Sequence, residues 1–201
     1  MKIVVMGGSF NPPTLAHKIL MKEAIAAIDA DLGLFVPSSN AYVARKMSKK
    51  KQNNQLYSET ERLEMLELIT KEVPKSKVST CEYGDDGKGH TYNTLLKIQK
   101  EYPNADVFFL CGADNLNYIY KWRESKKLIS EFNFLVVKRE CENPIAIIES
   151  VPIMKDLEDH FTIMIQPNGI DEISSTKVRE SINRKDINVL NTMCPKEIIT
   201  Y

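Results

Sequence analysis

Six short apolar runs that alternate with amphipathic stretches constrain the fold of this chain more than any other feature. The runs are KIVVMG, LGLFVP, KVSTCEY, ADVFFLCG, FNFLVVKR and FTIMIQP. Their nearly continuous hydrophobicity is typical of strands that are buried on both faces of a sheet. Helical patterns are expected at 15–30, 58–72, 92–101, about 122–131 and 174–183, and at 143–160 with a break at Pro152. This alternation predicts an α/β fold with a doubly wound parallel sheet.

Composition narrows the class of protein. The chain has 201 residues and no Pro/Gly/Ser-rich linker, so we expect one domain over 1–201, with a C-terminal helical part at about 174–201. Lys+Arg and Asp+Glu both number 27, which argues against nucleic acid or an anionic membrane as partner. No apolar run is long enough to span a bilayer and no signal pattern opens the chain, so a cytoplasmic protein is expected. The 4 cysteines lack C-x-x-C spacing, which argues against a zinc site.

The first predicted strand ends in a turn, GGSFNPPTLAH, that matches neither a P-loop nor a dinucleotide-binding G-x-G-x-x-G motif. Because glycine lacks a Cβ, the backbone amides of Gly7 and Gly8 can approach a phosphate closely. Thr14 can cap the next helix, whose first N–H groups would then face an anion. His17 follows three residues later on the same helix face. On spacing alone, a tight connection with a partly buried histidine is an equal alternative.

A second segment, DEISSTKVRESI, gathers polar groups at another predicted helix start. Its hydroxyls come from Ser174, Ser175 and Thr176, and its cations from Lys177 and Arg179. Hydroxyls, free amides and cations at a helix N-terminus suit a polyphosphate. The alternative is an ordinary Ser/Thr cap followed by basic residues.

Together the two segments resemble the nucleotidylyltransferase superfamily with a T/H-x-G-H motif, and specifically the nicotinamide/nicotinate mononucleotide adenylyltransferases. Thr14 and Ala16 stand where the bacterial pattern has His and Gly. Seven stretches match the family in chain order: GGSFNPPTLAH, VPSSNAY, LYSETERLEMLEL, HTYNTLLKI, FFLCGADNL, FNFLVVKR and ISSTKVR.

The resemblance implies a Rossmann-like fold and a defined reaction. The phosphate of nicotinate or nicotinamide mononucleotide attacks the α-phosphate of ATP, which yields the NAD-type dinucleotide and pyrophosphate. Mg²⁺ is expected to accompany ATP, bound mainly through phosphates and water. Because the attacking phosphate is already ionised, His17 is interpreted as a hydrogen-bond donor to the transition state, with Thr14 and Arg179 as further catalytic residues.

The resemblance also implies which residues bind each substrate. The expected ATP-binding residues are Gly8, Ser9, Phe10, His17, Ser175, Thr176, Lys177 and Arg179. The expected mononucleotide-binding residues are Asn40, Arg45, Lys46, Thr91, Thr94, Gly112, Asp114, Trp122 and Arg139.

Within the mononucleotide set, Trp122 is expected to stack on the pyridine ring. The alternatives are a packing role for Trp122, a helix cap for Asp114, and solvated charges for Arg139 and for the basic segment 45–55. Two other histidines, His90 and His160, are interpreted as structural or surface residues.

Two other functions remain alternatives. One is adenylyl or cytidylyl transfer to a different phosphorylated acceptor, and the other is a non-catalytic nucleotide sensor of the same fold. HTYNTL and Trp122 favour a pyridine nucleotide over other acceptors, while His17 together with ISSTKVR argues against a sensor. Both pyridine mononucleotides remain candidate acceptors, and a homo-oligomer is compatible with the sequence.

Overall fold

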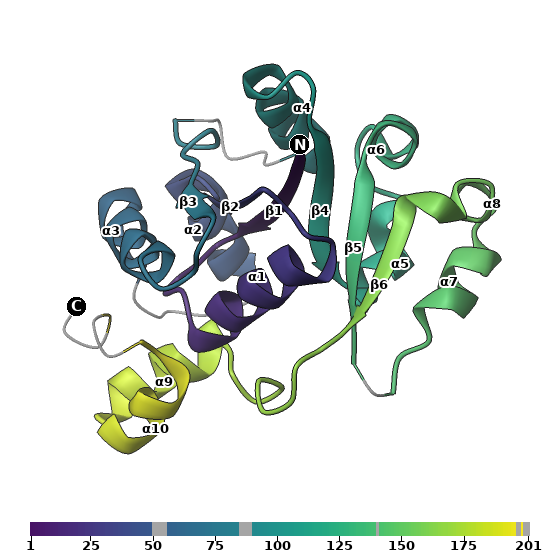
Figure 1. The fold of residues 1–201 in the computed structure, drawn as a ribbon. Helices are drawn as coiled ribbons and strands as arrows, with labels where there is room; N and C mark the ends of the chain where they lie inside the picture. The colour runs from purple at the N-terminus through teal and green to yellow at the C-terminus, as the bar shows by residue number, and fades with distance from the viewer. Residues whose placement is uncertain (50–55, 85–89, 140, 196–197, 199–201) are drawn as a thin grey trace.

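Six parallel strands form the centre of the protein (Figure 1). The computed structural model describes residues 1–49, 56–84, 90–139, 141–195 and 198. The sheet order is β3-β2-β1-β4-β5-β6, which confirms the predicted doubly wound α/β fold. The order reverses between β1 and β4, and at such a switch point a crevice opens beyond the carboxyl ends of the strands. The strands are β1 (Lys2–Gly8), β2 (Leu32–Pro37), β3 (Ser76–Val78), β4 (Asp106–Gly112), β5 (Asn133–Lys138) and β6 (Phe161–Ile165).

The helices largely follow the predicted pattern. The helix predicted at 122–131 begins only at Ser125, so Trp122 lies in a turn. The third strand is shorter than KVSTCEY because residues 81–84 form a turn, and a helix within 38–55 was not predicted. The helices are α1 (Leu15–Ala27), α2 (Asn40–Lys49), α3 (Glu59–Thr70), α4 (Thr91–Glu101), α5 (Leu116–Ile119), α6 (Ser125–Glu131), α7 (Pro144–Ser150), α8 (Pro152–Lys155), α9 (Ser175–Arg184) and α10 (Ile187–Met193), with short 3-10 turns η1 (Ala113–Asn115) and η2 (Glu158–His160).

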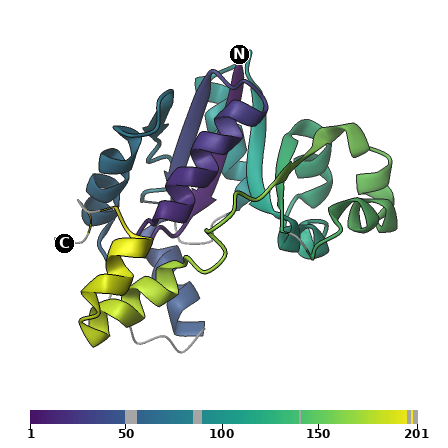
Figure 2. The same cartoon turned by 60° about the horizontal axis from the view of Figure 1, so that its bottom comes forward.

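Two apolar cores lie on opposite faces of the sheet. Side chains alternate along a strand, so Ile3 and Val5 enter one core while Val4 and Met6 enter the other. The first core also holds buried residues of α4 and α6, and the second holds those of α1 and α3. α9 and α10 pack against each other at one end of the molecule, drawn in yellow-green and yellow in Figure 2. Helices on both faces therefore leave the carboxyl ends of the central strands as the place for a ligand.

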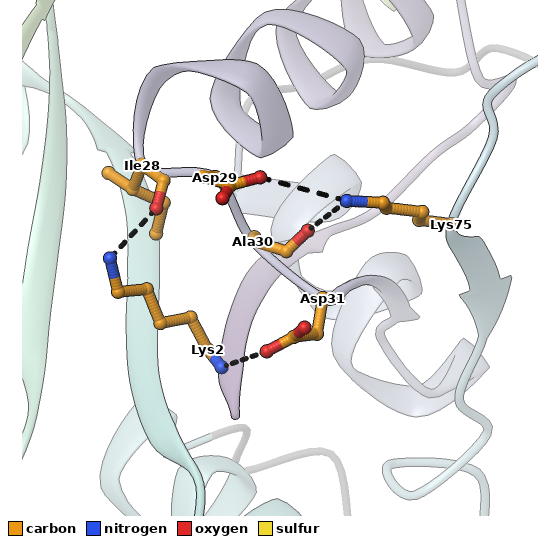
Figure 3. Close-up of polar contacts among 6 residues, drawn as sticks. All are labelled: Lys2, Ile28, Asp29, Ala30, Asp31 and Lys75. Carbon is orange, nitrogen blue, oxygen red and sulfur yellow. Dashed lines mark hydrogen bonds and ion pairs between the residues drawn. The ribbon is translucent and has the colours of Figure 1, made fainter.

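Lys2 and Lys75 form hydrogen bonds at the amino ends of the strands, opposite the carboxyl ends (Figure 3). The backbone N–H of Lys2 donates to Asp31 Oδ2 at 2.8 Å, and its Nζ donates to the Ile28 carbonyl at 3.0 Å. Lys75 Nζ donates to the Ala30 carbonyl at 3.2 Å. Cations are favoured near the C-terminal end of a helix, here just beyond α1. These contacts fix the amino ends of the strands, whereas the candidate site lies at their carboxyl ends.

Candidate active site

The loop after β1 forms the backbone of the candidate site. Phe10 is buried and has a positive φ of 43°, and its ring meets the His17 ring edge-on with centroids 4.9 Å apart. A Cβ on Gly8 would lie 3.2 Å from the Phe10 ring. Glycine at this position therefore leaves room for the aromatic ring that packs against His17.

His17 is held in one tautomer by the start of α1. The backbone N–H of Thr14 donates to His17 Nδ1 at 3.0 Å, and the Thr14 hydroxyl lies 2.8 Å from the same nitrogen. Since a backbone N–H can only donate, Nδ1 is the acceptor and the ring proton is on Nε2. Burial, and then the nearby charge of Lys46, lower the pKa of His17 to about 4. The imidazole is therefore neutral at physiological pH and offers an N–H donor.

The N-terminus of α9 clamps the loop after β1. Arg179, 5% exposed, donates through Nη1 to the Asn11 carbonyl, and Ser175 Oγ donates to the Pro12 carbonyl at 2.8 Å. Ser174 caps the helix by accepting from the Lys177 backbone N–H at 3.2 Å. The two segments singled out in the sequence thus lie together in the structure.

Two adjoining cavities open at this edge of the sheet. The smaller, of about 230 Å³, is lined by seven of the expected ATP-binding residues: Gly8, Ser9, Phe10, His17, Ser175, Thr176 and Arg179. The larger, of about 420 Å³, is lined by four of the expected mononucleotide-binding residues: Lys46, Thr91, Thr94 and Trp122. Gly8, Ser9 and Lys46 line both cavities. Ligands bound in the two cavities would therefore meet at this shared boundary.

Aromatic and polar groups shape the larger cavity. Trp122 packs edge-on against Phe109, with ring centroids 6.3 Å apart. Thr94 Oγ1 donates to Glu82 Oε1 at 2.6 Å, and Glu82 is only 8% exposed. Lys46 Nζ lies 3.4 Å from Ser9 Oγ at the boundary with the smaller cavity. An apolar ring and a cation therefore both line the larger cavity.

Other expected site residues line neither of these two cavities. The Thr14 N–H donates to His17 Nδ1, Lys177 forms an ion pair with Glu172, and Asn40 Oδ1 accepts from Arg62 at 2.9 Å. The remaining ones are Arg45, which lies over the Tyr42 ring, Gly112, Asp114, whose carboxylate folds back over Gly112, and Arg139, whose Nε lies 3.4 Å from Gln166 Oε1. Of the basic segment 45–55, residues 50–55 lie outside the described ranges.

Several residues around the cavities were not predicted. Arg62 of α3 is 0% exposed and donates to the Ser9 carbonyl at 2.8 Å. Its signal was one arginine within the otherwise helical apolar pattern of LYSETERLEMLEL. Glu82 and Arg123 line the larger cavity, and so does His90, which the sequence analysis treated as structural or surface. No local pattern distinguishes these three from ordinary surface residues.

Other kinds of site find no support within the described ranges. They contain no group of three or more His, Cys, Asp or Glu side chains placed to hold a metal ion. They also contain no helix of the length and apolarity that a membrane span requires. None of the four cysteines, all of which lie in the described ranges, forms a disulfide, and burial raises the pKa of Cys111 to about 12 and that of Cys194 to about 11, which disfavours their reactive thiolate forms.

The glycine-containing loop after β1, a neutral histidine and the N-terminus of α9 lie together at a Rossmann-like switch point, which fits a nucleotidyl-transfer site. The cytidylyltransferase-like family model matches residues 5–181, and the chain belongs to that family. Similar proteins of about the same length include nicotinate-nucleotide adenylyltransferases. A probable one from Staphylococcus epidermidis is 32% identical over 200 residues, covering 100% of this chain and 93% of the relative. The Bacillus subtilis nicotinate-nucleotide adenylyltransferase is 28% identical over 184 residues, covering 92% and 87%. These relatives confirm the resemblance seen in the sequence.

The fold has a close counterpart among solved structures. Plasmodium falciparum nicotinic acid mononucleotide adenylyltransferase complexed with APC superposes with a TM-score of 0.77 at 21% identity, covering 100% of this chain and 93% of that one. The same enzyme complexed with NaAD gives a TM-score of 0.73. The chain with its six-stranded sheet therefore has the same fold as these two solved structures.

Proposed function

We propose that this chain is a nicotinate-nucleotide adenylyltransferase, which transfers AMP from ATP to nicotinate mononucleotide and releases pyrophosphate. The observation that carries this proposal is the pair of cavities that share Gly8, Ser9 and Lys46. ATP would occupy the smaller cavity and the mononucleotide the larger one. The attacking phosphate and the α-phosphate of ATP would then meet at the shared boundary.

Catalysis in this proposal comes from positioning and charge stabilisation. Holding both reactants at one boundary removes much of the entropic cost of bringing them together. The mononucleotide phosphate is ionised and needs no base, so His17 serves as a donor through Nε2–H. A neutral donor aimed at the ATP phosphates stabilises the charge that develops on the leaving pyrophosphate. Lys46 adds a positive charge where the two phosphates approach.

The start of α9 is the proposed holder of the β- and γ-phosphates. Ser175, Thr176 and Arg179 line the smaller cavity beside the N-terminus of this helix, where anions are stabilised. Lys177 can join them by exchanging its ion pair with Glu172 for one with phosphate. In this arrangement the start of α9 and the loop after β1 contact opposite sides of the triphosphate.

Mg²⁺ fits this site only as a companion of ATP. Among the described residues that line the smaller cavity there is no carboxylate, so these residues do not form a protein cage for the ion. Mg²⁺ usually keeps several waters and binds substrate phosphates, and it would neutralise phosphate charge here. We propose that it arrives with the nucleotide. We likewise propose one domain over 1–201 acting in the cytoplasm, with homo-oligomer formation to be measured by sedimentation.

A paired assay tests the proposed function. The protein is incubated with Mg²⁺-ATP and, separately, nicotinate mononucleotide, nicotinamide mononucleotide or a phosphorylated acceptor without a pyridine ring. Pyrophosphate and dinucleotide are expected with nicotinate mononucleotide. Release with only the non-pyridine acceptor would favour the same-fold alternative, and no release with any acceptor would favour a sensor.

A further inference from the structure

The larger cavity has cationic side chains in two separate parts. Lys46 lies where this cavity borders the smaller one, because it lines both. Arg123 lines only the larger cavity, beside Trp122. An acceptor with negative charge at both of its ends would match this distribution.

Among the described residues that line this cavity, Glu82 is the single carboxylate, and its charge acts on the buried guanidinium of Arg62. Glu82 is almost fully buried, and its Oε1 accepts the hydroxyl of Thr94 at 2.6 Å. One of its two oxygens is thus taken up by Thr94, whereas Arg123 lies beside Trp122 on the same cavity lining. The part of the cavity beside Trp122 therefore presents positive charge.

His90 orients the guanidinium of Arg123. Arg123 Nη1 lies 3.2 Å from His90 Nε2. Since a guanidinium only donates, the histidine nitrogen is the acceptor, and its ring proton is on Nδ1. A guanidinium has five N–H donors in a planar fork, so one bond to His90 leaves donors for a ligand. The guanidinium is thus oriented at the cavity and still has N–H donors available for a ligand.

We propose that Arg123, positioned by His90, is a specificity-determining residue that selects nicotinate over nicotinamide mononucleotide by pairing with the carboxylate on the pyridine ring. The inference rests on the proposed function. With the phosphate near Lys46 and the ring beside Trp122, the ring substituent comes within the range of Arg123. A carboxylate forms charge-assisted, bidentate bonds with a guanidinium, whereas a neutral carboxamide does not.

The test compares kcat/KM for the two mononucleotides in wild type, Arg123→Gln, Arg123→Lys and the control Lys121→Ala. Lys121 is an exposed cation of the same turn, stacked over Tyr120, that does not line the cavity. Arg123→Gln is expected to lower the nicotinate-to-nicotinamide ratio about tenfold, the value of one charge-assisted hydrogen bond. The loss should appear in KM for nicotinate mononucleotide. Arg123→Lys should restore part of the ratio, and Lys121→Ala should leave it unchanged.

Each result has one meaning. A ratio in Arg123→Gln equal to that of wild type would overturn the inference while leaving the proposed function intact. A ratio that falls equally in Lys121→Ala would overturn it too, because the effect would then be general electrostatics. Absence of turnover by wild type with either mononucleotide would instead contradict the proposed function. Thermal melts should show equal stability, since both side chains are exposed.

The orienting role of His90 has its own variant. His90→Ala should lower the ratio about threefold, less than Arg123→Gln, because the guanidinium keeps its charge but loses its fixed direction. The double variant should then equal Arg123→Gln alone, since the two residues act through one group. Additive losses would show that His90 does not act through Arg123.

Discussion

A single hydrogen bond decides which proton His17 offers to a ligand. Because the Thr14 N–H occupies Nδ1, the only remaining polar group of the ring is Nε2–H. The low pKa of about 4 removes the charged form at neutral pH. The residue is therefore built as a neutral donor and not as a base, which fits a reaction whose nucleophile is already ionised.

Replacing His17 with alanine tests this role. Loss of one preorganised donor is expected to lower kcat by about 10²–10³-fold, with little change in folding. Steady-state pyrophosphate release and a circular-dichroism melt measure the two effects. A near-normal rate in the variant would exclude His17 from the mechanism.

The pKa of His17 also predicts how stability depends on pH. The folded protein resists protonation down to about pH 4, whereas the unfolded chain takes up the proton near 6.5. The neutral ring therefore contributes its full stability above pH ~6.5, and this contribution is lost as the pH falls toward ~4. Between pH 7 and 5 the wild type should lose about 1–2 kcal/mol more than His17→Asn in urea unfolding. Equal losses would mean that the ring titrates normally.

At the scale of elements, Arg62 joins three parts of the site. From α3 it donates to the Ser9 carbonyl of the loop after β1 and to Asn40 Oδ1 at the start of α2. Its guanidinium lies 5.7 Å from the Tyr83 ring centroid, and burial lowers its pKa. α2 in turn brings Lys46 to the boundary of the two cavities. This buried charge thus fixes the relative position of the loop and α2.

Substituting Arg62 should therefore affect stability and turnover together. Arg62→Met leaves the Ser9 carbonyl and the Asn40 side chain without their donors, which should cost about 2–4 kcal/mol of unfolding free energy. At temperatures where the variant is folded, kcat should fall more than either KM rises. Lys71→Met, at the exposed end of α3, is the matched control. A stable variant with normal kcat would contradict the role.

The same elements show how far the sequence could predict the structure. The strands and most helices follow from apolar periodicity, which is local. α2 did not, because only Val43 and Met47 of its residues are buried and its position depends on distant groups such as Glu59, whose Oε1 accepts from the Asn40 N–H. The contact between Arg179 and the Asn11 carbonyl spans 168 residues, and only the family resemblance linked the two segments. Nothing local distinguished Arg123 or His90, since their importance arises from sharing one cavity.

At the scale of the whole molecule, α9 and α10 have a small apolar core of their own, although α10 also contacts α1. Their buried apolar residues, Val178, Leu190 and Cys194, make a cluster apart from the two main cores. The start of α9 is fastened to the loop after β1 by the polar contacts of Arg179 and Ser175. Because this core is small and the rest of the attachment is polar, the free energy of local unfolding should be lower for α9 and α10 than for the sheet.

Hydrogen exchange tests this difference. Amides of α9 and α10 should exchange faster than those of β1 and β4 in the free protein. A non-hydrolysable ATP analogue that bridges α9 and the loop should slow exchange in α9 much more than in β5. If α9 were as protected as β4 without nucleotide, the two helices would not open separately.

The shared boundary of the two cavities has a kinetic consequence. Since Gly8, Ser9 and Lys46 line both, the proposed mechanism has the dinucleotide product occupying at once the places that the two substrates take separately. The product should then inhibit competitively against ATP and against the mononucleotide alike. A bisubstrate inhibitor that joins mimics of the two halves of the dinucleotide would exclude both substrates and bind with the combined affinity of both cavities.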